Sequence, residues 1–123
     1  LLPEWFLSGL VLTLKAVMRK TPMGFIMLGI ITNDPFDKRI AELVAVAVAP
    51  DGRRMGIADR LMTAGLRMAE ERFVEQVILH TGVENLAAQA LFEKHGFVSS
   101  ERKKGFYPNG QNALMMVKAI RTQ

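Results

Sequence analysis

An apolar segment, Leu43 to Ala49, leads directly into a basic turn with two glycines, and a helix is predicted to begin at about Gly56. This order places the first backbone N–H groups of the helix, which lack intrahelical partners, at the positive end of the helix dipole. Gly56 has no Cβ to hold an anion away, and Arg53 and Arg54 add positive charge beside it. The turn is therefore predicted to bind a phosphate or pyrophosphate group.

The spacing of apolar residues along the rest of the chain predicts a mixed sheet with helices on its faces. A helix between two strands indicates a parallel pair, whereas a short turn such as Asn109-Gly110 indicates an antiparallel hairpin. Leu1 to Leu7 is predicted to be the end of a helix, Thr21 to Gly24 a turn, and Asn33 the start of a loop. The predicted strands are 10–20, 25–32, 40–49, 76–80, 97–102 and 113–119, and the predicted helices are 56–73 and 85–94. The first helix has a predicted apolar face from Ile57 to Phe73, and the fold class is α/β, with a mixed (α+β) sheet.

Composition limits the class of protein further. The 123 residues suit one domain spanning 1–123, and half of them are apolar, as in an ordered globular domain. The longest apolar runs, 23–31 and 43–49, are shorter than the roughly 18 residues that a membrane-spanning helix needs. Leu1 to Glu4 lacks the basic region of a secretory signal peptide, and the absence of cysteine excludes disulfides and a cysteine nucleophile. We expect a cytoplasmic location and no membrane partner.

The net charge of +4 comes from 16 basic and 12 acidic residues. The basic residues are scattered, and the nearest approach to a cluster is Arg102-Lys103-Lys104. This distribution indicates either a solvated surface or an attraction for a polyanionic cofactor. A nucleic-acid partner is not expected, because only the net charge suggests one.

The loop carries a recognisable pattern. Arg53-x-x-Gly56-x-Ala58 is neither a G-x-G-x-x-G fingerprint nor a P-loop ending in Gly-Lys-Ser/Thr. It resembles the R/Q-x-x-G-x-G/A signature of the GCN5-related N-acetyltransferases (GNAT), whose loop grips the pyrophosphate of acetyl-CoA. The predicted element order resembles that acyl-CoA N-acyltransferase fold from its second strand onward. We therefore expect the N-terminal strand and most of the first helices of the family to be missing before Leu1.

Three further segments resemble parts of this family. Asn85 to Phe97 is similar to N-x-x-A-x-x-L-Y-x-x-x-G-F, with Phe92 in place of the tyrosine. Phe106-Tyr107-Pro108 is similar to the Tyr-Tyr-Pro of ribosomal-protein N-terminal acetyltransferases. Ala41 to Val44 is similar to histone acetyltransferases, in which a glutamate at this spacing before the loop is the base.

The resemblance implies direct transfer of the acetyl group of acetyl-CoA to a primary amine, without a covalent enzyme intermediate and without a metal. It also implies that strand backbone groups hold the pantetheine and that the loop holds the pyrophosphate. Asn85 would contact the pantetheine arm; a plain helix N-cap is the alternative role, and one residue can serve both. The implied cofactor-binding residues are Val46, Ala47, Val48, Arg53, Arg54, Met55, Gly56, Ile57, Ala58, Asp59 and Asn85.

Two residues are candidates for catalytic proton transfer. An alkyl amine is mostly protonated at pH 7 and needs a base, while the departing thiolate gains from a proton donor. Glu42 is the only carboxylate inside an apolar strand, where burial would raise its pKa; a solvent-facing glutamate with ordered water as the base is the alternative. Tyr107, the sole tyrosine, has a hydroxyl with a pKa of about 10 that can protonate a thiolate. Its alternative role is packing beside Phe106.

His80 is predicted to be a plain strand residue and His95 a helix-end cation, not metal ligands.

The acceptor is less well defined. The Phe-Tyr-Pro and Asn-Gly-Gln-Asn-Ala segments favour a protein N-terminal α-amine as the acceptor. Amino acids, polyamines, aminoglycosides and other small amines remain open, as do a catalytically silent acetyl-CoA sensor and a homodimer.

Overall fold

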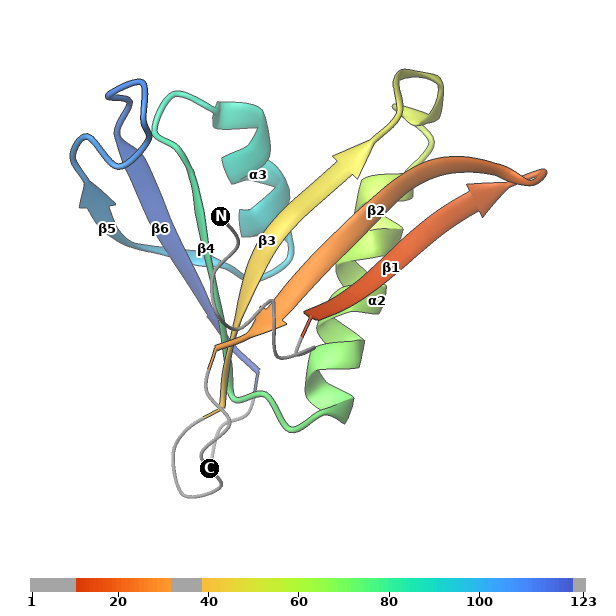
Figure 1. The fold of residues 1–123 in the computed structure, drawn as a ribbon, viewed down its shortest axis with the longest axis horizontal. Helices are drawn as coiled ribbons and strands as arrows, with labels where there is room; N and C mark the ends of the chain where they lie inside the picture. Colours follow the sequence, from red (N-terminus) through yellow and green to blue (C-terminus); the bar gives the residue numbers. More distant parts are fainter. Residues whose placement is uncertain (1–10, 32–38, 121–123) are drawn as a thin grey trace.

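A computed structural model describes residues 11–31 and 39–120 of the chain. Within them, strands and helices follow one another in the predicted order (Figure 1). The elements are β1 Val11–Met18, β2 Thr21–Ile30, β3 Ile40–Val48, the 3₁₀ turn η1 Pro50–Gly52, α2 Ile57–Glu71, β4 Gln76–Gly82, α3 Leu86–Lys94, β5 Val98–Lys103 and β6 Ala113–Ala119. The predictions for Leu1 to Leu7 and for the loop from Asn33 lie outside the described residues.

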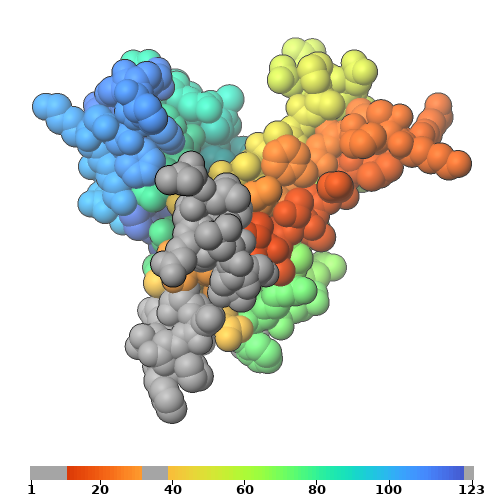
Figure 2. All heavy atoms as spheres, in the orientation of Figure 1, coloured from red at the N-terminus to blue at the C-terminus, as the bar shows by residue number. Residues whose placement is uncertain are grey.

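The strands form one mixed sheet in the order β1-β2-β3-β4-β6-β5. The pair β3–β4, which is separated by α2 in the sequence, is parallel as predicted, and the other neighbouring pairs are antiparallel. The same rule fails for β4 and β5, which flank α3 but do not pair, because β6 lies between them. Parallel pairing joins only Ile40–Glu42 to Gln76–Ile78. Beyond these residues the sheet opens into two arms, β1–β3 and β4–β6 (Figure 1). Figure 2 shows the surface hollowed between them.

A β-bulge contributes to this opening. Met27 of β2 pairs with Ala45 and Leu28 pairs with Leu43, so Val44 of β3 has no opposite residue. An extra residue of this kind bends its strand and increases the local twist. The bulge lies two residues after the last residue that β3 pairs with β4. It therefore helps to carry the end of β3 away from β4.

Helix α2 packs on the arm formed by β1, β2 and β3. Its buried residues include Leu61, Met62 and Ala69, which confirms most of the predicted apolar face. Gly65 lets the helix come close to the sheet, because a Cβ there would lie 2.8 Å from Cδ1 of Ile26. None of the helices among the described residues is long and apolar enough to cross a bilayer.

The predicted end of this helix was wrong. The helix ends at Glu71, and Phe73 is 65% exposed instead of lying on the apolar face. The cause is a Schellman-type ending: the N–H of Phe73 (φ +62°) bonds to Glu70 and that of Val74 bonds to Ala69. This ending turns the chain so that Val74, not Phe73, enters the core.

The predicted turn at Thr21 to Gly24 was also wrong, because these residues belong to β2. The turn is instead Arg19-Lys20, with φ of +49° and +67°, between the paired residues Met18 and Thr21. A two-residue hairpin turn needs positive φ at both central positions, which matches the twist of the flanking strands. Pro22 is tolerated because it lies at the start of β2, next to an irregularity in the pairing with β1.

Candidate active site

The predicted anion-binding loop has the backbone geometry that this role requires. Arg54 and Gly56 both have left-handed backbones, with φ of +66° and +73°. Gly56 is the N-cap of α2 and has no side chain with which to cap the helix. The first intrahelical hydrogen bond runs from the N–H of Arg60 to the carbonyl of Gly56, at 3.1 Å. The N–H groups of the three residues between them therefore point out of the helix start, as an anion would require.

The space above this loop is open. A Cβ at Gly56 would have no heavy atom within 4 Å, and the side chains of Arg53, Arg54 and Met55 are exposed around it. Ile57 is different, because its side chain is buried in the core, and only its backbone can face an anion. The residues at this helix start thus fit a phosphate-bearing ligand on the grounds of backbone donors, charge and room.

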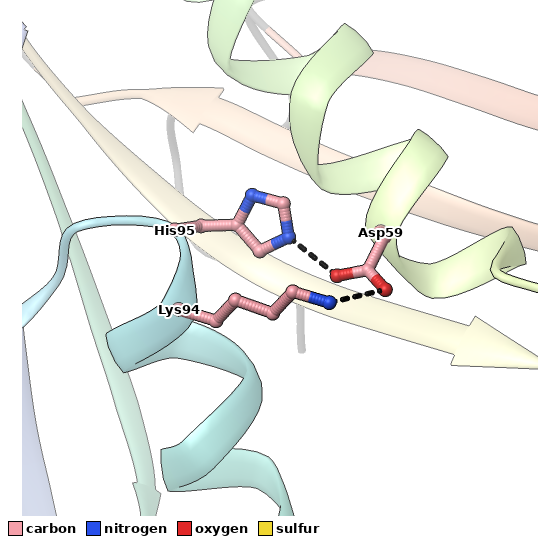
Figure 3. Close-up of polar contacts among 3 residues, drawn as sticks. All are labelled: Asp59, Lys94 and His95. Carbon is pink, nitrogen blue, oxygen red and sulfur yellow. Dashed lines mark hydrogen bonds and ion pairs between the residues drawn. The ribbon is translucent and has the colours of Figure 1, made fainter.

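Asp59 is the one acidic residue of the predicted loop, and its carboxylate points elsewhere. One oxygen lies 2.8 Å from Nε2 of His95 and the other lies 3.0 Å from Nζ of Lys94 (Figure 3). The hydrogen bonds from His95 and Lys94 hold the pKa of Asp59 below its ordinary value of 3.8. The side chain links α2 to the end of α3, so only the backbone of Asp59 is left to meet an anion.

The second part of the predicted cofactor site is the edge of β3. Residues Val46, Ala47 and Val48 pair with β2 on one side, whereas β4 no longer pairs with them on the other. In an antiparallel pair, alternate backbone groups point away from the partner strand. These groups face the gap between the two arms, and their contact with a cofactor stays a prediction.

Glu42 and His80 meet where the two arms begin to diverge. Glu42 pairs with Ile78 across the parallel strands, and His80 lies two residues further along β4, on the same face of the sheet. Nδ1 of His80 is 3.3 Å from Oε2 of Glu42. The side chain of Glu42 is 29% exposed, so the carboxylate is only partly buried, not enclosed by the apolar strand as predicted.

Aromatic rings connect this pair to Tyr107. The ring of Phe106 stacks on His80, with centroids 4.5 Å apart and planes 14° apart. Phe106 in turn meets Tyr107 edge to face at 5.1 Å. Partial burial raises the pKa of the Tyr107 hydroxyl above 10.0, so the phenol remains a proton donor across the physiological range. Glu42 and Tyr107, the two predicted catalytic residues, are therefore linked through the His80–Phe106 stack, Glu42 by its contact with His80 and Tyr107 by its contact with Phe106.

Tyr107 also borders a cavity of about 860 Å³. One wall is the turn between β4 and α3, residues 82–85, and the other is the loop 107–112 before β6. Asn85 lines this cavity and also caps α3, because its Oδ1 accepts a hydrogen bond from the N–H of Ala88 at 3.1 Å. The helix-cap role considered for Asn85 is thus confirmed, and its contact with a cofactor stays a prediction.

Comparison with known proteins identifies the family. Residues 4–97, well over half of the chain, match the model of the acetyltransferase (GNAT) family. The chain belongs to this family.

Individual relatives agree with this assignment. The chain is 31% identical over 112 residues to an N-alpha-acetyltransferase of Saccharolobus solfataricus, a match that covers 85% of the chain and 67% of the relative. Its structure is similar to that of the ribosomal-protein-S18-alanine N-acetyltransferase from Escherichia coli, with a TM-score of 0.81, 26% identity, and coverage of 96% of the chain and 76% of the other. It is also similar to a chain of the NatC complex bound to Gag peptide and CoA, with a TM-score of 0.80, 26% identity, and coverage of 87% and 70%.

Within this GNAT fold, the structure adds residues to the site that the sequence did not indicate. His80 was predicted to be a plain strand residue, yet it contacts Glu42 and stacks on Phe106. Lys94 and His95 bind Asp59 of the loop helix. The polar contacts join residues 35 or more positions apart and the His80–Phe106 stack joins residues 26 apart, so no local pattern encodes them.

Proposed function

We propose that this GNAT domain transfers the acetyl group of acetyl-CoA to the α-amine of a protein or peptide N-terminus. The observation that carries the proposal is the pair of features at the gap between the arms. The open, basic helix start lies at the end of β3, and Glu42, His80 and Tyr107 gather where β3 and β4 separate. The relatives named as N-terminal acetyltransferases support this acceptor class.

The residues that would hold acetyl-CoA follow from the geometry. Backbone N–H groups at the start of α2, with Arg53 and Arg54, would bind the pyrophosphate. The unpaired edge of β3 at 46–48 would bind the amides of the pantetheine arm. The structure of a NatC chain with CoA bound supports this ligand. When bound, acetyl-CoA supplies the activated thioester, and the protein contributes orientation and proton transfer.

Glu42 is the proposed base. The attacking amine nitrogen forms a bond to the acetyl carbon while the carbon–sulfur bond breaks, and the amine must lose a proton. Glu42 accepts this proton directly or through water, since its side chain is partly exposed at the gap. His80, which faces Glu42 at 3.3 Å, would hold the carboxylate in place by donating from Nδ1. In that tautomer Nε2 of His80 is an acceptor, and this buried atom has no hydrogen-bond partner among the described residues.

Tyr107 is the proposed acid. The departing thiolate takes the proton of the phenol, and the base later returns a proton through solvent, so no atom is gained or lost by the enzyme. The raised pKa keeps Tyr107 protonated and therefore competent at neutral pH. The stack of Phe106 on His80 fixes the position of the neighbouring Tyr107 ring relative to the base.

The acceptor is proposed to lie in the cavity beside Tyr107. Its walls carry polar groups that suit a peptide backbone, including Gln111 and Asn112, and one carboxylate, Glu84, that suits an ammonium group. A volume of about 860 Å³ has room for more than one residue. This is consistent with a peptide end, and it would also admit a small amine.

An acceptor panel tests the proposal. The chain is incubated with acetyl-CoA and with peptides whose α-amine is free, with the same peptides blocked by N-acetylation, and with amino acids, polyamines and aminoglycosides. Release of free thiol and the mass of each acceptor are measured. We expect a mass gain of one acetyl group on free peptides and none on blocked ones. Transfer to small amines alone would overturn the acceptor class, and binding of acetyl-CoA without any transfer would indicate a sensor.

A further inference from the structure

The two arms of the sheet are bridged on the helical side by a cluster of three polar side chains, Asp59, Lys94 and His95. Asp59 is in the first turn of α2, Lys94 is the last residue of α3, and His95 is the C-cap of α3. Figure 3 shows the Lys94 and His95 side chains converging on the carboxylate from the other helix. His95 is 13% exposed, Asp59 38% and Lys94 64%, so the cluster ranges from a nearly buried imidazole to a solvated ammonium.

The place of Asp59 is unusual for an anion-binding helix start. A carboxylate in the first turn stabilises an ordinary helix by facing its positive end. Here, however, the same helix end is the proposed pyrophosphate site, and an unpaired carboxylate three residues after Gly56 would repel the ligand. Both oxygens of Asp59 are instead engaged by donors from α3. The contact therefore removes a repulsion and joins the two helices at once.

The two helices belong to different arms. Helix α2 packs on β1, β2 and β3 and carries the pyrophosphate loop. Helix α3 is tied to the end of β4 by Gln89, whose Nε2 donates to the carbonyls of Gly82 and Val83 at 3.1 and 2.8 Å. That second arm carries His80 and Tyr107. Since β3 and β4 pair over only three residues, their own hydrogen bonds do little to fix the spacing of the arms further out.

We propose that the Asp59–Lys94–His95 cluster is a positioning clasp that sets the spacing between the two arms. A donor held by its pyrophosphate at α2 then places its thioester beside Glu42 and Tyr107. This inference rests on the proposed function and deepens it. It proposes that three residues that do not contact the reacting groups hold together the two halves of one long ligand site. His95 provides the fixed geometry, and the exposed Lys94 provides charge that solvent largely screens.

Binding measurements with a whole ligand and a fragment test the clasp without relying on turnover. In the proposed binding mode CoA extends from the loop to Asn85 and Tyr107 of the second arm, whereas ADP offers a pyrophosphate to the loop alone. If the clasp aligns the arms, the affinity for CoA contains a gain from joining two subsites that ADP does not have. Calorimetry on Asp59→Ala and His95→Ala should show a Kd for CoA raised roughly tenfold, with the Kd for ADP unchanged within about twofold. His95→Ala is the cleaner variant, because it leaves the whole of α2 intact and leaves Lys94 paired with Asp59, so that the carboxylate is still neutralised.

Asp51→Ala is the matched control. It removes one carboxylate from η1, just before the loop, but this residue is not part of the clasp. Its Kd for CoA should match that of the wild type. Thermal unfolding of each variant separates folding from binding, and a lower Tm with unchanged Kd values for folded protein would make the cluster a purely structural contact.

The remaining outcomes also decide the matter. An equal loss of affinity for CoA and ADP would place the effect in the loop and overturn the clasp. Tighter binding of both ligands would show only that the repulsion by Asp59 had been removed, and it would overturn the clasp as well. A wild-type chain that binds neither ligand would overturn the proposed function and the clasp together. A wild-type chain that binds both, with variants that show no difference between the ligands, would overturn the clasp and leave the proposed function standing.

Discussion

Gly56 offers a way to separate the two requirements of the anion-binding loop, its backbone shape and its open space. Its φ of +73° is left-handed, and a Cβ at this position would have no heavy atom within 4 Å. Gly56→Ala therefore creates no clash, and the destabilisation comes from the backbone alone, about 1–2 kcal/mol. For a chain of this size we expect the Tm to fall by about 3–8 °C.

Binding of CoA should respond differently from stability across a series at this position. Asn tolerates the left-handed region, so Gly56→Asn should fold nearly as stably as the wild type. Its side chain nevertheless occupies the space through which phosphate oxygens would approach the helix start. Gly56→Glu adds bulk and a negative charge there. We expect the Kd for CoA to rise at least tenfold in both variants, which corresponds to about 1.4 kcal/mol or more.

Gly105→Ala is the control for backbone strain. Gly105 also has a positive φ, +61°, and a Cβ there would have no neighbour within 4 Å, but it lies between β5 and β6, away from the loop. It should lower the Tm as Gly56→Ala does and leave the Kd for CoA unchanged. Calorimetry with CoA on the folded variants gives the comparison. A wild-type Kd in Gly56→Glu would remove the loop from the site and refute the assignment of its N–H groups.

Three further predictions concern the proton-transfer residues and the clasp. Glu42→Gln should lower kcat by about 10²-fold at pH 7, and this loss should become smaller as rising pH supplies free amine. Full activity at pH 7 would mean that another group is the base. Tyr107→Phe should lower kcat by roughly 10²-fold with little change in the Kd for acetyl-CoA, and ultraviolet titration of the wild type should place the pKa of this sole tyrosine above 10.0; a parallel loss of stability and binding would make it a packing residue. The folded-state pKa of Asp59 is lowered from 3.8, so its contribution to stability is fully present above that pH and is lost as the pH falls through the folded value. The difference in Tm between wild type and Asp59→Asn should therefore be constant near neutral pH and shrink in acid, and a constant difference down to the lowest pH would contradict this assignment.

The sequence predicted those parts of the fold that depend on local signals. The strand before the loop, the basic turn and the start of α2 are consecutive in the chain, and hydrophobic periodicity with one glycine was enough to place them. The parallel pair followed from the helix between β3 and β4, whereas the insertion of β6 between β4 and β5 has no local signal in the sequence. Boundaries were less accurate where the backbone conformation decides them. Phe73 has apolar character and helical spacing, but the left-handed ending of α2 places it outside the core.

The contacts that complete the site depend on register and on distant pairings. His80 meets Glu42 because β3 and β4 pair with Ile78 opposite Glu42, and a shift of one residue would turn His80 to the other face. No property of the isolated strand sequence specifies that register. Likewise, Asp59 looks like an ordinary first-turn carboxylate in the sequence, and its partners are 35 and 36 residues away. The types of these residues can be read from the sequence, whereas their contacts depend on how the sheet is assembled.

The short parallel pairing also explains why the candidate catalytic residues lie where they do. Two parallel strands that separate after three paired positions expose their backbone edges only beyond that point, and ligands of open sheets bind at the carboxyl ends of such strands. Glu42 is the last residue of β3 that pairs with β4, so it lies at the inner end of the gap, while the loop at Gly56 follows the outer end of the same strand. A long ligand that enters the gap from the loop must therefore present its far end to Glu42. In the proposed site, the point at which β3 and β4 separate therefore decides where the reacting group of the donor meets the proposed base. A change that moves this point would shift both ends of the site.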